Sequence, residues 1–341
     1  MSSIGRDMKS AAWEDIDEKG IDQVRVTNLM VGFVQENRVI RAVNDISFEI
    51  KKGEVLCLLG ESGSGKSVTL RALLGLLPKQ ANVTGNVVIS GHDVLALRGQ
   101  HLRDYRGAVT SMIFQEPMNA LDAVFPVGFQ IAETVRRHMK VSRRAAKQRA
   151  LELMRLVQIP SPERRYYAYP HELSGGLRQR VMIAVALAPE PSFLLADEPT
   201  TALDATVQIQ ILLLLRKLVD ELGMSMVFVT HDLGVAGEIS DRIAVMYAGR
   251  FVEIGQTHEV VKEPMHPYTV GLLNATITPA HRGHLLTPIP GEPPDLAALP
   301  RGCSFSQRCA HVSDKCSEKV PDFERREEGR YIRCIKEMSL E

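Results

Sequence analysis

Residues 60–67 read Gly60-Glu61-Ser62-Gly63-Ser64-Gly65-Lys66-Ser67, and they carry the most specific pattern in the sequence. It fits the pattern G-x-x-x-x-G-K-[ST], in which glycines let the backbone close around phosphate oxygens in front of a helix N-terminus. In such a loop Lys66 supplies a positive charge to the β- and γ-phosphates, and the Ser67 hydroxyl ligates Mg²⁺. The stretch therefore predicts a site for a nucleoside triphosphate and magnesium, with a strand before it and a helix after it.

The surrounding sequence alternates between two patterns. Short apolar runs bounded by polar or glycine residues, which are typical of strands buried on both faces, occur at 55–59, 112–114, 193–196 and 226–229. Helical patterns lie between them at 67–77, 129–158, 176–188 and 205–222. Residues 24–50 alternate apolar and polar side chains, as half-buried strands do. We therefore expect an α/β fold, with residues 116–180 as a mostly helical insertion.

Each later apolar run ends at a residue that can take part in phosphate chemistry. Ligands of open α/β sheets bind beyond the carboxyl ends of the strands. Asp197 at a buried strand end needs a compensating partner, which Mg²⁺ beside Lys66 would provide. Glu198 is then placed to orient or deprotonate an attacking water. Gln115 and His231 end two other runs and are expected to reach the γ-phosphate or its metal, although each alone is also typical of a polar strand end.

A second anion-binding pattern lies at Leu173-Ser174-Gly175-Gly176-Leu177-Arg178-Gln179-Arg180. A serine and two glycines at the start of a helix direct backbone N–H groups at an anion. One nucleotide does not need two γ-phosphate sites in the same chain. We therefore predict that Ser174, Gly175 and Gly176 close on a nucleotide held by another subunit.

In this order, from about residue 24 to residue 255, the motifs resemble those of the nucleotide-binding subunits of ABC transporters. The resemblance implies a Walker A loop at 60–67, the Q-loop at Gln115, the signature at 173–180, Walker B at 193–198, the D-loop at 201–204 and the switch histidine at His231. It also implies that Gln115 joins Ser67 and Asp197 around Mg²⁺. Asp204 would contact nucleotide, and Phe33 falls where the family stacks an aromatic ring on adenine, unless it is a core phenylalanine.

The same resemblance implies the architecture and the assembly. We expect a P-loop NTPase fold, with a RecA-like core, an antiparallel β subdomain and a helical subdomain. Two such subunits would form a head-to-tail dimer that holds two ATP molecules, each between the Walker A loop of one subunit and the signature of the other. Glu198, His231 and Gln115 would act in ATP hydrolysis.

The chain changes character near residue 256, where prolines become frequent. The segments His266-Pro267-Tyr268-Thr269-Val270-Gly271-Leu272-Leu273, Ile289-Pro290-Gly291-Glu292-Pro293-Pro294-Asp295 and Gly302-Cys303-Ser304-Phe305, with Arg308-Cys309, resemble the C-terminal extension of oligopeptide and dipeptide importers. We therefore predict three parts: an N-terminal extension at 1–23, an ABC ATPase domain at 24–255 with its helical subdomain at about 116–180, and the extension at 256–341.

Four of the five cysteines fall in this extension, namely Cys303, Cys309, Cys316 and Cys334. Their spacing, C-x5-C-x6-C-x17-C, lacks the C-x2-C pairs of common zinc ribbons. Four thiolates suit tetrahedral zinc or an iron–sulfur cluster. The family resemblance favours a [4Fe–4S] cluster, with zinc and free thiols as the alternatives.

The charge balance and the absence of long apolar segments limit which classes of partner we expect. Lysine plus arginine and aspartate plus glutamate each number 41, so no basic excess points to nucleic acid. We expect no signal peptide and no membrane span. The resemblance implies a peripheral subunit on the cytoplasmic face of the inner membrane. Its partners would be a second ATPase subunit, identical or related, two permease subunits and an extracytoplasmic solute-binding protein.

The predicted function is ATP hydrolysis that powers import of peptides or similar small solutes. The alternative is a non-transport ABC ATPase acting on DNA or ribosomes. Such proteins usually carry a long coiled-coil insertion or two cassettes, whereas residues 116–180 are short and one Walker A pattern is present.

Overall fold

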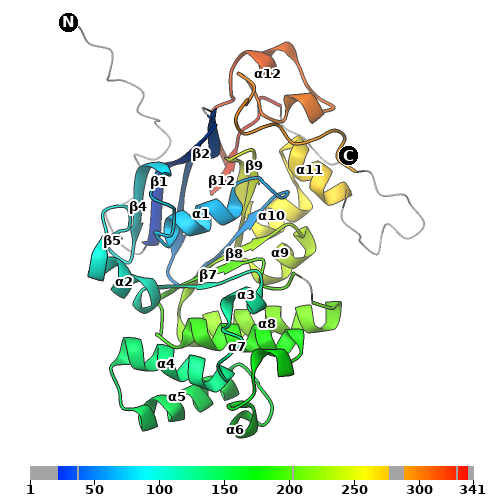
Figure 1. The fold of residues 1–341 in the computed structure, drawn as a ribbon. Coiled ribbons are helices and arrows are strands. Elements are labelled where there is room, and N and C mark those ends of the chain that lie inside the picture. The colour runs from blue at the N-terminus through cyan, green and yellow to red at the C-terminus, as the bar shows by residue number, and fades with distance from the viewer. Residues whose placement is uncertain (1–21, 37, 202, 276–287, 328, 337–341) are drawn as a thin grey trace, which may run out of the picture.

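The computed structural model describes residues 22–36, 38–201, 203–275, 288–327 and 329–336, so nearly all of the predicted N-terminal extension lies outside it (Figure 1). Its strands are β1 Asp22–Gln35, β2 Arg38–Lys51, β3 Val55–Leu59, β4 Asn82–Ile89, β5 His92–Asp93, β6 Thr110–Ile113, β7 Phe193–Asp197, β8 Ser225–Thr230, β9 Arg242–Tyr247, β10 Arg250–Gln256, β11 Glu324–Glu327 and β12 Arg330–Ile332. Its α-helices are α1 Lys66–Leu73, α2 Gly99–Ala108, α3 Pro117–Ala120, α4 Val127–Met139, α5 Arg143–Leu156, α6 Pro162–Arg165, α7 Gly175–Leu187, α8 Ala205–Leu222, α9 Leu233–Ile239, α10 Thr257–Lys262, α11 Pro267–Asn274 and α12 Asp314–Glu318.

The strands form two sheets. The larger one has the order β11-β12-β10-β9-β3-β8-β7-β6, and its strands from β9 to β6 are parallel. The smaller one, β2-β1-β4-β5, is antiparallel. The predicted α/β fold with an antiparallel β part is therefore confirmed. The parallel strands place their carboxyl ends at one edge, where the polar side chains that follow them meet.

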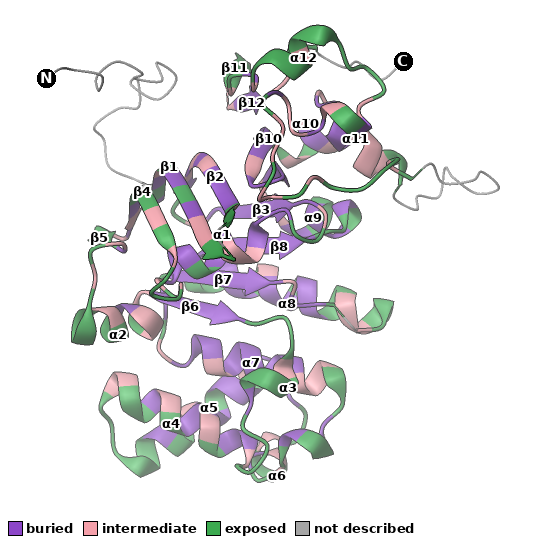
Figure 2. Cartoon of the chain, turned by 45° about the horizontal axis from the view of Figure 1, so that its top comes forward, coloured by how far each residue is buried: buried purple, intermediate pink, exposed green. Residues whose placement is uncertain are grey.

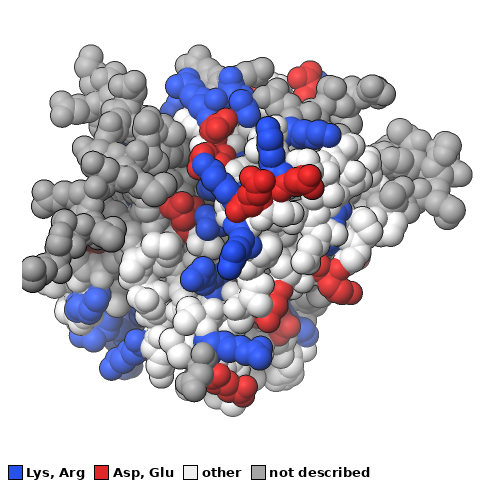
Figure 3. Space-filling view, turned by 90° about the horizontal axis from the view of Figure 1, so that it is seen from above, with Lys and Arg blue, Asp and Glu red and all other residues white. Residues whose placement is uncertain are grey.

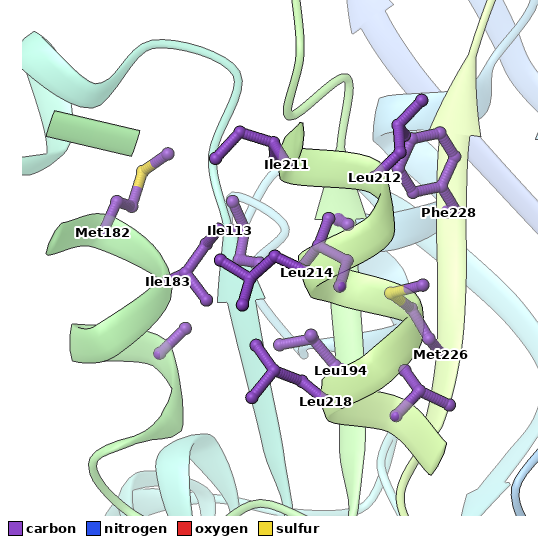
Figure 4. Close-up of a cluster of buried hydrophobic side chains, with 14 of the residues drawn as sticks. Ile113, Met182, Ile183, Leu194, Ile211, Leu212, Leu214, Leu218, Met226 and Phe228 are labelled. Atoms are coloured by element: carbon purple, nitrogen blue, oxygen red, sulfur yellow. The ribbon is translucent and has the colours of Figure 1, made fainter. Parts of the chain in front are cut away.

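The central strand β3 is buried on both faces, as its unbroken apolar sequence predicts (Figure 2). Val55, Cys57 and Leu59 pack with the helices on one face, whereas Leu56 and Leu58 pack with the antiparallel sheet on the other. On the helical face, apolar side chains from α7, α8 and β7 point toward one another (Figure 4). Two packed layers thus hold the strand that leads into the phosphate loop.

The predicted continuous helix at 129–158 is wrong, because the structure divides it into α4 and α5. Lys140 adopts a left-handed conformation with φ of 53° and ends α4. The hydroxyl of Ser142 accepts a hydrogen bond from the N–H of Ala145 and caps the start of α5. Phe114 was predicted to close the strand β6, but it lies beyond the strand end and its exposed fraction is 41%.

The elements after residue 256 lie at the end of the molecule opposite to α4, α5 and α6 (Figure 1). They are joined to the larger sheet, because β12 pairs antiparallel with β10. A buried ion pair supports this junction, with 3.2 Å between Arg330 Nη2 and Glu253 Oε1. Within the described part of the chain, no helix combines the length and the apolar character needed to cross a membrane.

Candidate nucleotide site

The loop after β3 is shaped by glycines that no other residue could replace. A Cβ added at Gly60 would lie 2.2 Å from the Met246 carbonyl oxygen, and one at Gly65 would lie 2.3 Å from that of Ala42. Gly65 also has a left-handed φ of +108° and directly precedes α1. The loop is therefore packed against the neighbouring strands, and it delivers the N-terminus of α1 to the sheet edge.

Lys66 is buried at the first position of α1. Its Nζ donates hydrogen bonds to the carbonyl oxygens of Gly60, at 2.7 Å, and Glu61, at 2.8 Å. Burial lowers the pKa of Lys66, and the nearby carboxylates of Glu198 and Asp197 partly oppose that shift. The ammonium group is thus held inside the loop that the sequence predicts to surround phosphate.

The next residue meets the end of β7. The Ser67 hydroxyl donates to Asp197 Oδ1 at 3.0 Å. Asp197 is buried, and this burial raises the pKa of its carboxyl group, while the hydrogen bond from Ser67 lowers it. A hydroxyl and a carboxylate side by side supply the oxygen ligands that Mg²⁺ prefers.

Three side chains converge on one carboxylate oxygen of Glu198. Its Oε2 accepts a hydrogen bond from Gln115 Nε2 at 3.3 Å and from Thr201 Oγ1 at 3.0 Å, and it lies 3.4 Å from His231 Nδ1. These residues follow three different strands, β6, β7 and β8. The backbone of Glu198 has a φ of 43°, a conformation that is costly for this residue type and is often kept at functional sites.

These groups line a single cleft of about 830 Å³. Its walls include Gln115, Glu198, His231 and most of the loop, namely Glu61, Ser62, Gly63, Gly65, Lys66 and Ser67. Gly60, Ser64 and Asp197 do not line the cleft, and Asp197 reaches it only through its hydrogen bond with Ser67. Phe33 of β1 also lines the cleft, together with Ile40 and Ala42 of β2. An apolar wall of this kind suits a nucleotide base.

Other residues that line the cleft were not predicted to reach it, namely Ile40, Ala42, Val68, Leu272 and Leu296. Thr201 was predicted only as the first residue of the D-loop, without a contact to Glu198. Leu272 of α11 and Leu296 come from the extension. The N–H of Arg41 donates to the carbonyl oxygen of Leu296 at 3.1 Å, which ties this part of the extension to the strand beside the cleft.

The signature residues lie outside the cleft of their own chain. Ser174 and Gly175 are exposed at the N-terminus of α7. A Cβ at Gly176 would lie 2.6 Å from Val207 Cγ1, so this glycine allows α7 to pack closely on α8. Asp204 accepts a hydrogen bond from the N–H of Val207 at 3.0 Å and caps α8, and it does not line the cleft either.

The four cysteines of the extension are near enough to affect one another. The pKa of Cys303 is raised to about 11, mainly by burial, and the nearby thiols of Cys334, Cys316 and Cys309 contribute to this rise. However, in the described residues no group of three or more His, Cys, Asp or Glu side chains is arranged to hold a metal ion. The metal-ligand role of these cysteines stays a prediction.

A phosphate loop at the carboxyl edge of a parallel sheet, with an acidic strand end beside it, defines a P-loop nucleoside triphosphatase. The family described as ABC transporter matches residues 43–201, and the oligopeptide/dipeptide transporter C-terminal region matches residues 252–316. The chain belongs to the ATP-binding, ATP-hydrolysing subunits of peptide ABC transporters.

Relatives of known name show how far the similarity extends. The dipeptide transport ATP-binding protein DppD of Bacillus subtilis is 44% identical over 311 residues, which cover 91% of this chain and 93% of the relative. The oligopeptide transport ATP-binding protein OppD of Salmonella typhimurium is 43% identical over 313 residues, which cover 92% and 93%. These relatives support the predicted transport ATPase and not the alternative of an ABC ATPase acting on DNA or ribosomes.

Solved structures agree. The ATP-binding cassette MJ0796, in a dimeric post-hydrolysis state bound to ADP and Pi, has a TM-score of 0.63 and 30% identity. The similarity covers 69% of this chain and 98% of that one. A second cassette, cbiO1 from Clostridium perfringens, has a TM-score of 0.62 and 27% identity, and the match covers 71% and 91% of the two chains. The fold is therefore that of an ABC ATPase.

Proposed function

We propose that this chain hydrolyses ATP to drive import of peptides through separate membrane subunits. The observation that carries the proposal is the convergence of Gln115, Thr201 and His231 on Glu198, within the cleft that Lys66 enters. The proposed cargo follows from the relatives that are named as peptide or dipeptide transport proteins. No residue described above is expected to touch the cargo itself.

Each cleft residue has a proposed role. Lys66 and the loop at 60–65 bind the β- and γ-phosphates, while Phe33 stacks on adenine. Ser67 and Asp197 hold Mg²⁺ together with Gln115, and the ion supplies charge neutralisation on the phosphates. Glu198 takes the proton of the attacking water, and His231 and Gln115 keep its carboxylate in place near the γ-phosphate.

The exposed signature points to a second subunit. Ser174, Gly175 and Gly176 stand at a helix N-terminus, a place that favours anions, yet they lie outside the cleft of their own chain. We propose that they complete the cleft of a partner ATPase, identical or related, and that Asp204 contacts nucleotide across the same interface. The partner's signature would then cover the cleft described here.

A hollow of the helical subdomain is the proposed docking place for the membrane partners. Phe125 and Phe129 are exposed, and they line a hollow of about 330 Å³ with Arg136 and Tyr166. We propose that two permease subunits dock here at the cytoplasmic face of the inner membrane, and that a solute-binding protein delivers cargo from outside. Figure 3 shows basic and acidic side chains interspersed near the middle of the face that carries the extension.

Reconstitution tests the function. Proteoliposomes that contain the permease subunits and this chain should take up a labelled dipeptide such as dialanine, or a labelled tetrapeptide, only when ATP is supplied on the side of this chain. Omission of the chain should abolish uptake. Peptide uptake at an undiminished rate without this chain would contradict the proposal.

For the cysteines we propose a [4Fe–4S] cluster, with zinc as the alternative. Cys303 accepts a backbone hydrogen bond from Phe305, Cys309 from His311 at 3.4 Å and Cys334 from Lys336 at 3.4 Å. N–H groups aimed at sulfur stabilise metal-bound thiolate and tune such sites. Four thiolates are chemically suited to either group, although the described side chains are not arranged as a metal site, and a bound group would hold the extension together.

Metal analysis separates these alternatives. The protein purified without oxygen is expected to contain about four iron atoms per chain and the absorption of an iron–sulfur cluster. Cys309→Ser should lose the iron, whereas Cys57→Ala, which changes the buried cysteine of β3, should keep it. Zinc in place of iron would exclude the cluster, and protein free of both metals would contradict a metal site.

A further inference from the structure

The extension contacts the phosphate loop through the buried side chain of Arg308. Arg308 makes a two-point ion pair with Glu61, the second residue of the loop. Its Nη1 lies 2.7 Å from Glu61 Oε2, and its Nη2 lies 3.0 Å from Glu61 Oε1. The Arg308 side chain is only 5% exposed, so this forked contact is shielded from water and salt.

The remaining N–H groups of Arg308 are also paired. Nε donates to the carbonyl oxygen of Pro290 at 2.9 Å, Nη2 to that of Ile289 at 3.4 Å and Nη1 to the Tyr247 hydroxyl at 3.3 Å. The guanidinium group also lies against the Tyr247 ring. All five donors of the guanidinium group therefore have acceptors, and the arginine is fixed in one orientation.

The backbone of Glu61 is held from the same side. Its N–H donates to the hydroxyl of Tyr268 at 2.9 Å. Tyr268 is buried against Tyr247 and Phe305, with ring centroids 4.6 Å and 5.4 Å away. The carbonyl oxygen of Glu61, in turn, accepts the hydrogen bond from Lys66. The extension thus holds the carboxylate and the N–H of Glu61, and the carbonyl oxygen of the same residue positions Lys66.

The negative charge of Glu61 gives a second reason for its ion pair with Arg308. Glu61 lines the cleft, so a carboxylate released from Arg308 could turn toward the place proposed for the triphosphate. An unpaired carboxylate there would repel the phosphates, because both carry negative charge. Arg308 neutralises Glu61 and also directs it away from the loop toward the extension.

We propose that Arg308 is a positioning residue of the phosphate loop, which sets ATP affinity by fixing and neutralising Glu61. The proposal rests on the proposed function of the cleft as the ATP site. It gives the extension a part in nucleotide binding. The buried pair of Arg330 and Glu253 also joins the extension to the larger sheet without touching the loop, so a purely anchoring role is already filled there.

The test uses the full-length protein, with binding of a fluorescent ATP analogue and steady-state hydrolysis as readouts. Arg308→Gln is expected to weaken ATP binding and raise KM about tenfold, with kcat nearly unchanged. In that background, Glu61→Gln should restore most of the affinity, because the unpaired carboxylate is gone. Arg308→Lys, which keeps the charge but not the fork, should fall between Arg308→Gln and the unchanged protein.

A matched control is Arg330→Gln, which breaks a buried ion pair of the same extension. Arg330→Gln should lower the melting temperature without changing ATP affinity. If Arg330→Gln does not fold, Arg242→Gln, which breaks the ion pair with Glu54, serves as the control instead. Unchanged ATP affinity in folded Arg308→Gln, or no recovery on adding Glu61→Gln, would overturn the proposal. Failure of the unchanged protein to bind ATP would instead overturn the proposed function.

Discussion

Glu198→Gln is expected to lower ATP turnover at least about 100-fold, because the amide cannot take the proton of the attacking water. ATP binding should persist, since the substitution keeps the size of the side chain and does not touch Lys66 or Ser67. The amide also removes a negative charge near the γ-phosphate, so affinity is expected to rise slightly rather than fall. Phosphate release under saturating ATP and magnesium measures turnover, and equilibrium titration measures binding.

The matched control for this variant is Glu221→Gln, which makes the same chemical change on the exposed side of α8. It should hydrolyse ATP at the rate of the unchanged protein. If Glu198→Gln also turned over ATP at a near-normal rate, Glu198 would have no role in proton transfer, and another group would have to be the base.

Lys66→Ala should weaken ATP binding about 100-fold or more, because a buried ammonium group that faces two phosphates is lost. Its removal also leaves the carbonyl oxygens of Gly60 and Glu61 without their shared donor. The dissociation constants for ATP and ADP, measured by calorimetry, test this expectation.

Lys217→Ala, on the exposed surface of α8, controls for the loss of one positive charge and should leave both constants unchanged. A dissociation constant of Lys66→Ala equal to that of the unchanged protein would remove the loop at 60–67 from the phosphate site. The Arg308 variants are best interpreted against this result, because Arg308 acts on the same loop through Glu61.

Most of the parallel core could be predicted because β3, β6, β7 and β8 each contain a short apolar run that leads to a glycine or a polar residue, whereas the parallel strand β9 was not predicted. Most of the site could also be predicted from the residues at the carboxyl ends of these strands. The sheet topology places Gln115, Asp197, Glu198 and His231 at one edge. The division between α4 and α5 was not predicted, because the left-handed backbone of Lys140 has no sign in the sequence and Ser142, which caps α5, was not weighed as a helix start.

Contacts between distant segments were beyond sequence reasoning. Arg308 and Glu61 are 247 positions apart, and neither residue shows a pattern that identifies the other. The same limit applies to Leu272 and Leu296, which reach the cleft from the extension. The cysteine spacing likewise identified the four thiols but not their arrangement, which depends on how the turns around Cys309 and Cys316 fold.

A structure of the unchanged protein with a nonhydrolysable ATP analogue and magnesium would show whether this cleft binds ATP and whether a second subunit covers it. The account predicts the triphosphate between Lys66 and Glu198, with magnesium on Ser67 and Asp197 and the Ser174–Gly176 segment of a second subunit over the γ-phosphate. A triphosphate bound elsewhere, or held in this cleft in every assembled form while those signature residues face solvent, would contradict it.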